Sequence, residues 1–210
     1  MFCHFNKKIR ERGFTLVELL ISLSIVAVIL TTLVSRQSIY TDGAALSNLA
    51  DEISLTVFQT QAYGIGVREF SPGSSNFSVS YGLTLSLLGS GSNKAYLTFV
   101  DRNSNKLYDG DWSCPIGGAS ECVEKVNISR GNLIDSICVV RTSGVDQCNV
   151  AERVDISFAR PRTEAQITFF NGGGQVFAPS NIQGVKIVLK SPAGATRSIV
   201  VYNTGQISVQ

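Results

Sequence analysis

The chain has 210 residues, is 44% hydrophobic and has a formal net charge of +2 at pH 7. The first 13 residues hold four of the 18 basic residues, one of the 16 acidic residues and the only histidine. The remaining chain therefore has 14 basic and 15 acidic side chains and no histidine. Ser-His-Asp catalysis, Cys-His catalysis and histidine metal sites are excluded there, so we do not expect an enzyme.

A basic segment precedes a long apolar run. Four basic residues lie between positions 7 and 12, and residues 14–34 contain no Pro or Gly and one charged side chain, Glu18. At about 1.5 Å per residue such a helix spans roughly 31 Å, close to the ~30 Å hydrocarbon core of a bilayer. Because basic flanks stay cytoplasmic, we predict one transmembrane segment over 14–34 with the N-terminus inside and the C-terminal part exported.

Glu18 is unusual in this run because a carboxylate in a membrane helix costs several kcal/mol unless it has a partner. Lys and Arg are absent between Arg12 and Arg36, so the partner is expected on another molecule. Thr15, Glu18 and Ser22 recur at helical spacing and form a narrow polar stripe suited to helix–helix contact. The alternative is a plain signal anchor with one isolated Glu.

The residues from Gly13 to Glu18 carry a family resemblance. A short basic leader ending in Gly13, followed by Phe-Thr-Leu-Val-Glu and an apolar helix, resembles the class III signal of type IV pilins and type II secretion pseudopilins. The resemblance implies that a prepilin peptidase removes residues 1–13 and that the new amino group of Phe14 is methylated. It also implies that Glu18 pairs with this amine on a neighbouring subunit. Many major pilins carry a Pro shortly beyond the membrane run, whereas this run ends at Leu33-Val34-Ser35-Arg36 without one, which favours a minor pilin or pseudopilin.

Helical periodicity continues after the apolar run. Apolar residues recur at steps of three and four, at Ala45, Leu46, Leu49, Ile53 and Val57. Asp42 is a candidate N-cap after a small irregularity, and Gly64 and Gly66 are expected to end the helix. We predict a long helix over 14–62 whose amphipathic second half lies on a globular domain.

The rest of the chain, residues 63–210, is predicted to be that β-rich domain. Segments rich in Val, Ile, Phe and Tyr and bounded by turn residues predict strands at 77–83, 95–100, 123–129, 134–140, 154–159, 166–170, 185–190 and 198–202, with a short one near Ile207. Apolar and polar residues alternate over 77–81 and 154–158. Residues 171–174 (Asn-Gly-Gly-Gly) predict a hairpin loop. The expected fold class is α+β: a long N-terminal helix packed on an antiparallel β-rich domain, like that of type IV pilins.

Four cysteines lie in the predicted β domain. In an oxidising compartment they are expected to form disulfides. Three pairings are open, and we favour Cys114–Cys122 and Cys138–Cys148 because each closes a short loop containing turn residues. Each bond would contribute ~2–3 kcal/mol by restricting the unfolded chain. The alternative is one zinc site formed by all four thiolates, although their spacing is longer than usual for zinc.

The sharpest local pattern lies at 101–111. Oxygen-bearing side chains recur at Asp101, Asn103, Asn105, Asp109 and Asp111. Calcium takes six to eight oxygen ligands, and Asp and Asn at alternate positions are typical of loops that wrap it. Lys106 stands where an EF-hand loop has Gly, and no Glu closes the loop. The alternatives are a calcium site and a polar hairpin loop, and no other cofactor is predicted.

The basic residues of the β domain are dispersed and matched by acidic ones. FimT-like pilins that take up DNA use basic residues near the C-terminus, whereas residues 205–210 contain no arginine. Nucleic acid is therefore not an expected partner.

Beyond the N-terminal motif, the long helix, the β domain and residues 198–205 most resemble the GspH/FimT-like pseudopilins and minor pilins. The resemblance implies a structural subunit of a type IV pilus or type II secretion pseudopilus. Such a subunit is anchored in the bacterial inner membrane and then enters an extracytoplasmic filament. Its partners would be prepilin peptidase and other pilin or pseudopilin subunits, in a homo- or heteropolymer. The alternatives are a DNA-uptake or adhesive minor pilin that binds a ligand, and a monomeric membrane-anchored domain.

Overall fold

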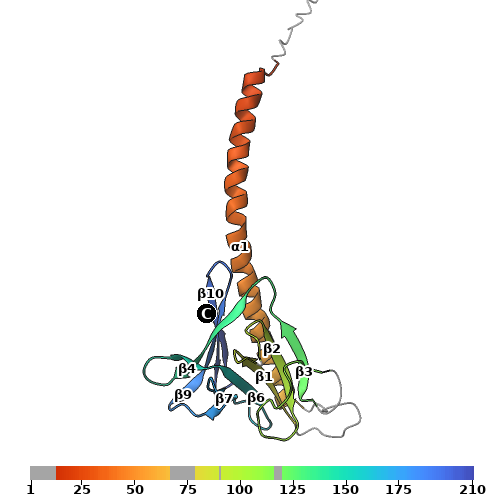
Figure 1. Ribbon diagram of the computed structural model, residues 1–210, viewed down its shortest axis with the longest axis vertical. Helices are drawn as coiled ribbons and strands as arrows, with labels where there is room; N and C mark the ends of the chain where they lie inside the picture. The colour runs from red at the N-terminus through yellow and green to blue at the C-terminus, as the bar shows by residue number, and fades with distance from the viewer. Residues whose placement is uncertain (1–12, 67–78, 90, 116–119) are drawn as a thin grey trace, which may run out of the picture. The chain divides into compact units, whose positions relative to one another are not determined.

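The computed structural model describes residues 13–66, 79–89, 91–115 and 120–210, without the side chains of residues 35, 36, 38 and 39. Within these residues it contains one α-helix, α1 (Leu16–Ile65), and eleven β-strands (Figure 1). The chain divides into two compact units, of which the first ends at Thr41 and the second runs from Asp42 to Gln210. Helix α1 contributes to both units.

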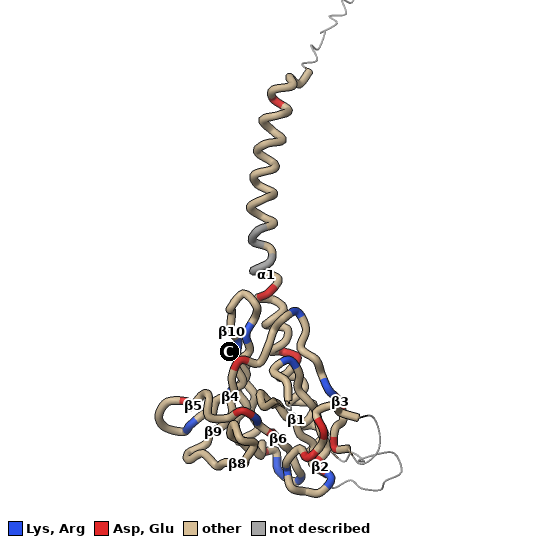
Figure 2. The backbone as a smooth tube through the Cα atoms, viewed as in Figure 1, with Lys and Arg blue, Asp and Glu red and all other residues tan. Residues whose placement is uncertain are grey.

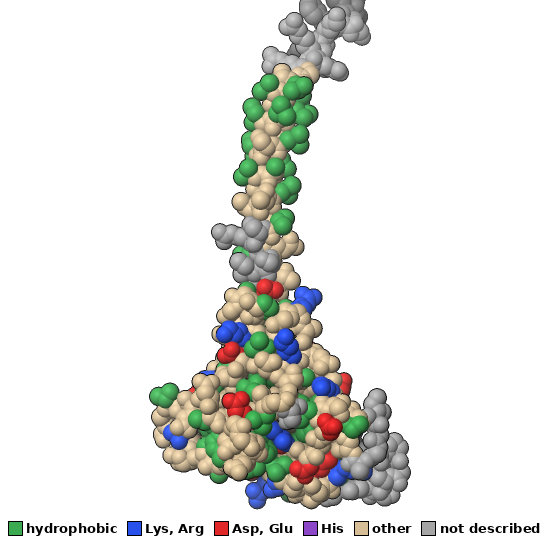
Figure 3. Space-filling view, viewed as in Figure 1, with side chains coloured by type: hydrophobic (Ala, Val, Ile, Leu, Met, Phe, Trp, Pro, Cys, Tyr) green, Lys and Arg blue, Asp and Glu red, His purple; other side chains and the backbone are tan. Residues whose placement is uncertain are grey.

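The N-terminal part of α1 is apolar around its whole circumference. Leu16–Val34 has a mean hydropathy of 2.5 and none of it is buried, and hydrophobic side chains cover it in the space-filling view (Figure 3). By length and composition this segment is able to cross a membrane. The expected irregularity at Asp42 is wrong, because α1 continues through it and Gly43. A single Gly inside a helix costs only about 1 kcal/mol, which packing of the following turns offsets.

The second unit contains two antiparallel sheets (Figure 1). In the part of the chain that the structure describes, sheet A has six strands in the order β3-β2-β1-β6-β7-β8, namely β1 Ser80–Ser86, β2 Ala95–Asp101, β3 Cys122–Asn127, β6 Arg153–Phe158, β7 Gln166–Phe170 and β8 Val176–Phe177. Sheet B has five in the order β11-β10-β9-β4-β5, namely β4 Leu133–Arg141, β5 Gln147–Ala151, β9 Ile182–Lys190, β10 Thr196–Tyr202 and β11 Ile207–Val209. The predicted α+β class with an antiparallel β domain is confirmed.

One hydrophobic core joins the second half of α1 to both sheets. The helix supplies Leu46, Leu49, Ala50, Ile53 and Val57, and all five are buried. Four of them belong to the periodic face expected from the sequence, whereas its other member, Ala45, is half-buried, and Ala50 was not expected. Strands of both sheets complete the core from β1, β4, β6, β9 and β10. At the end of α1, a Cβ on Gly64 would lie 2.4 Å from the carbonyl oxygen of Phe158, so the close approach of helix and β6 requires glycine there.

The other face of sheet A is covered by the connection from β2 to β3, which we call the cover segment (residues 102–114). Tyr108 and Trp112 of this segment pack on Leu97 and Phe99 of β2. Consequently the polar positions of the alternating pattern are buried as well, and Asp155 on β6 is 0% exposed. The alternation over 154–158 therefore separates an apolar core from a buried polar layer, rather than a core from solvent.

The strands match the sequence expectation best where the alternation is strong. β7 has the predicted bounds, and residues 171–174 form the predicted hairpin loop to β8, with Phe170 paired to Val176. The first predicted strand begins outside the described residues, and the observed strand is shifted to Ser80–Ser86. Two strands were not predicted, β5 and β8, because β5 is largely exposed and polar and β8 has two residues.

Candidate processing and assembly site

Thr15 is the N-cap of α1. The backbone amide of Glu18 donates to Thr15 Oγ1 at 3.3 Å, and the amide of Leu19 donates to the Thr15 carbonyl oxygen at 3.2 Å. Gly13 and Phe14 precede the helix, and the Phe14 side chain is 77% exposed. The peptide bond between Gly13 and Phe14 therefore lies outside the hydrogen-bond ladder of α1, where a peptidase does not have to unwind a helix to reach it.

Glu18 lies in the first turn of α1, three residues after the cap. A negative charge there is favoured by the positive end of the helix dipole. Its carboxylate is exposed on the surface of the apolar segment and has no hydrogen-bond or ion-pair partner among the residues that the structure describes. Acidic and basic positions are otherwise sparse along this half of α1 (Figure 2). The helix cap therefore fixes the position of Glu18 without neutralising it.

The hydroxyl groups of the apolar segment have partners within the helix itself. Ser22 Oγ donates to the Leu19 carbonyl at 2.9 Å, and Thr31 Oγ1 donates to the Ala27 carbonyl at 2.6 Å. Ser24 and Thr32 make the same kind of bond. In lipid such local bonds spare the hydroxyls the cost of burial without a partner. Of the predicted stripe Thr15, Glu18 and Ser22, only the Glu18 side chain is left for a group outside the helix.

A comparison with protein-family models finds the prokaryotic N-terminal methylation motif at residues 8–34. The motif covers Gly13, Phe14, Thr15 and Glu18, whose geometry is described above. Together with the α+β fold, which is that of type IV pilins, the match supports a type IV pilin-like protein. No curated protein and no solved structure match the chain. Inferences about the function of the β domain therefore rest on its own structure, because no known relative matches it.

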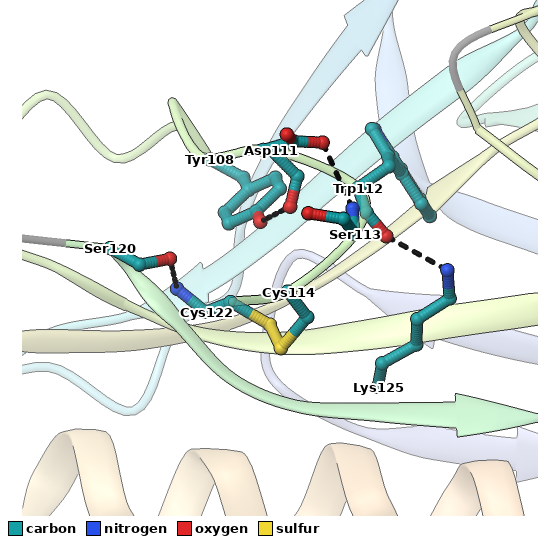
Figure 4. Close-up of a disulfide and its surroundings, with 8 residues drawn as sticks. All are labelled: Tyr108, Asp111, Trp112, Ser113, Cys114, Ser120, Cys122 and Lys125. Atoms are coloured by element: carbon teal, nitrogen blue, oxygen red, sulfur yellow. Dashed lines mark hydrogen bonds between the residues drawn. A yellow bond between two sulfur atoms is a disulfide. The ribbon is translucent and has the colours of Figure 1, made fainter. Parts of the chain in front are cut away.

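The four cysteines of the β domain form two disulfides, Cys114–Cys122 and Cys138–Cys148, which are the pairs favoured by loop length. The first joins the end of the cover segment to β3. In Figure 4, Tyr108 OH donates to the Asp111 carbonyl at 2.6 Å and Lys125 Nζ donates to the Trp112 carbonyl at 2.8 Å. The second disulfide ties edge strand β5 to β4, since Cys138 and Cys148 are register partners. Both bonds therefore fasten the margins of the sheets.

Asp101, the first residue of the predicted calcium pattern, is completely buried at the end of β2. Its Oδ2 accepts bonds from Ser80 Oγ at 2.7 Å and from the Lys106 amide at 2.8 Å. Its Oδ1 accepts from the Asn105 amide at 3.2 Å. Both oxygens are thus used to turn the chain from β2 into the cover segment.

The remaining residues of the pattern are brought together only in part. Asn103 and Asn105 meet Asp109, but each donates its side-chain amide to Asp109 Oδ2, at 2.7 and 2.5 Å. Asp111 accepts instead from the Ser113 amide at 2.9 Å. Across the described residues, no group of three or more His, Cys, Asp or Glu side chains is placed to hold a metal ion. Calcium requires converging oxygen atoms, so this arrangement of donors and acceptors does not fit it, and calcium binding stays an untested prediction.

Two further carboxylates organise the cover segment and were missed by sequence reasoning. Glu121 is buried, and its two oxygens accept from the amides of Arg102 and Asp109. Asp155 accepts from the Tyr108 amide at 2.8 Å and from Arg153. A usable signal was the spacing of Arg153 and Asp155, because residues i and i+2 of a strand share one face.

Proposed function

We propose that this chain is a structural subunit of a type IV pilus or a type II secretion pseudopilus, closest in kind to the GspH/FimT-like minor pilins. The methylation motif at residues 8–34 and the α+β fold support this proposal. In the proposed form, residues 1–13 are a leader peptide, residues 14–62 carry the assembly helix and residues 63–210 form the β domain exposed outside the membrane.

Processing comes first in this proposal. The precursor is inserted with its basic leader in the cytoplasm, and prepilin peptidase cuts after Gly13. Methylation then modifies the new amino group of Phe14. The position of both residues ahead of the Thr15 cap supports cleavage between them, since cutting there leaves α1 and its N-cap intact.

Assembly is proposed to follow from Glu18. The observation that carries the proposal is that hydroxyls of Leu16–Val34 have partners within α1, whereas the Glu18 carboxylate has none among the described residues. The methylated amine of Phe14 on a neighbouring subunit would supply the missing cation. Packing of several α1 helices would then exclude lipid from the pair, which strengthens the attraction between the charges.

Mass spectrometry of the mature protein tests the processing step. We expect a chain that begins at methylated Phe14. Gly13→Glu should leave the precursor uncut, because a charged, bulky side chain occupies the residue before the cut, while Gly13→Ala is the matched small-residue control. Wild-type protein that retains Met1 at its N-terminus in membranes containing active prepilin peptidase would overturn the proposed function.

A further inference from the structure

A cavity of about 300 Å³ lies within the second unit, between α1 and sheet A. One wall is a single face of α1, because its residues recur at helical spacing. The other wall is formed by β1, β2 and β3. The cavity lining includes Glu52 and Tyr63 from α1 and Tyr81, Tyr96 and Glu124 from the strands.

Two carboxylates face this cavity without a cation of their own. Glu52 Oε1 accepts a bond from Tyr96 OH at 3.4 Å, a long contact to a neutral donor. Neither Glu52 nor Glu124 forms an ion pair with any residue that the structure describes. Lys125, the neighbour of Glu124, donates instead to the Trp112 carbonyl at 2.8 Å. The negative charge of the cavity is therefore not compensated within the described chain.

The rest of the wall is aromatic. Tyr63 and Tyr81 lie edge to face with ring centroids 5.8 Å apart, and Tyr96 completes the aromatic lining. Burial, with a smaller contribution from Glu52 and Glu124, raises the pKa of Tyr96 to about 12. Its hydroxyl therefore stays neutral at physiological pH. Aromatic faces and carboxylates both attract an organic cation, and the rings also accept its alkyl stem.

An exposed apolar side chain also lines the cavity, because Val123 on β3 is 54% exposed. Protein interfaces are enriched in Tyr and Arg, and their anchoring side chains enter well-packed pockets of the partner, so a cavity lined by tyrosines and carboxylates fits a cationic side chain of another protein.

We propose that this cavity receives a Lys or Arg side chain of another protein subunit, with its cationic group near Glu52 and Glu124 and its stem against the tyrosine rings. The inference that a pilin subunit supplies this side chain rests on the proposed function. The preference of the cavity for an organic cation is independent of the proposed function.

The first experiment measures binding to the full-length protein in detergent by ligand-observed NMR. The probes are Nα-acetyl-arginine methylamide and its neutral isostere, Nα-acetyl-citrulline methylamide. We expect the arginine compound to bind about fivefold more tightly. Glu52→Gln and Glu124→Gln should remove most of that difference. Asp51→Asn is the matched control, because Asp51 is an exposed neighbour on α1 outside the cavity lining. Equal binding of the two probes, or binding of neither, overturns the proposal.

The second experiment tests the source of the cation in cells. Glu52→Arg and Glu124→Arg should lower the fraction of the protein in purified filaments at least about fivefold, with processing at Gly13 and membrane level unchanged. Asp51→Arg should have no such effect. If the arginine probe binds but the charge reversals leave incorporation unchanged, the cavity takes a free small cation and subunit docking is overturned. If wild-type protein is never processed or assembled, the proposed function fails, and the probe experiment alone decides whether the cavity selects a cation.

Discussion

Arg153 and Asp155 form an ion pair on the covered face of sheet A, with Arg153 Nη2 2.6 Å from Asp155 Oδ2. Both residues also bind the backbone of Tyr108. Arg153 donates to the Tyr108 carbonyl oxygen at 2.6 Å, and the Tyr108 amide donates to Asp155 at 2.8 Å. The Arg153 guanidinium lies 4.2 Å from the centre of the Phe170 ring. The pair therefore attaches the cover segment to β6, and its effect on stability is through that attachment.

Asp155→Ala is expected to destabilise the protein by ~3–5 kcal/mol, because it removes the buried partner of the Arg153 guanidinium, whose side chain is only 17% exposed. Chemical unfolding followed by the fluorescence of Trp112, the only tryptophan, measures the loss. The control is Asp135→Ala, whose pair with Lys190 is 3.4 Å long and exposed, with an expected loss below ~1 kcal/mol. Similar losses in both variants would mean that the buried pair contributes no more than a surface pair.

Asp101→Ala is expected to lower the free energy of unfolding by about 2–4 kcal/mol, equally in calcium and in chelator, because three donors lose a buried acceptor. This variant therefore cannot by itself separate a calcium site from a structural turn. The discriminating measurement is the melting temperature of the wild-type protein with and without calcium. A calcium-dependent rise that Asp109→Asn abolishes would establish an ion at the loop, contrary to the contacts described.

Tyr96 is expected to make stability depend on pH in the alkaline range. An unfolded tyrosine loses its proton near pH 10, whereas burial raises the pKa of Tyr96 to about 12. Deprotonation therefore favours the unfolded chain, so this contribution is complete below pH 10 and is lost as the pH rises through 12. Melting temperatures measured over that range should fall less steeply in Tyr96→Phe than in the wild type. Parallel slopes would contradict the burial of this hydroxyl.

Glu18→Val is expected to leave the protein inserted in the membrane, since it removes a charge that costs several kcal/mol in lipid. Incorporation into filaments should fall steeply, because the proposed partner amine loses its carboxylate. Membrane fractionation and subunit counting in purified filaments measure the two effects. Ser24→Val is the control, because the Ser24 hydroxyl bonds within α1. Normal incorporation of Glu18→Val would give Glu18 a different role.

Short-range patterns predicted the elements of this fold, but not their partners. The periodic face of α1 and the strand β7 were read directly from spacing, since helix and strand periods act over a few residues. The pairing of β1 with β6 was not, because it joins segments that are far apart in the chain. Strand β5 was missed because its place on the sheet depends on β4 and on the disulfide from Cys148, rather than on its own propensity.

The candidate site divides in the same way. Gly13, Phe14 and Glu18 could be predicted as site residues because their motif is contiguous, and the structure adds the Thr15 cap. The amide bonds to the oxygens of Asp101 were not predicted, since the pattern at 101–111 shows which side chains could bind an ion and not which amides already bond to them. The cavity between α1 and sheet A gave no signal in the sequence, because its walls come from four separate elements.

Ser22, Ser24, Thr31 and Thr32 donate hydrogen bonds to carbonyl groups of α1. These bonds also affect how subunits behave in the membrane before assembly. Because these hydroxyls already have hydrogen-bond partners within their own helix, they give unassembled helices little tendency to associate non-specifically in the bilayer. The Glu18 carboxylate leaves a deficit of several kcal/mol that lipid does not relieve. Under the proposed assembly, each unassembled subunit therefore carries the free-energy cost of an unpaired Glu18 in lipid. That cost is removed when the subunit joins the growing end of the filament, and its removal favours assembly there.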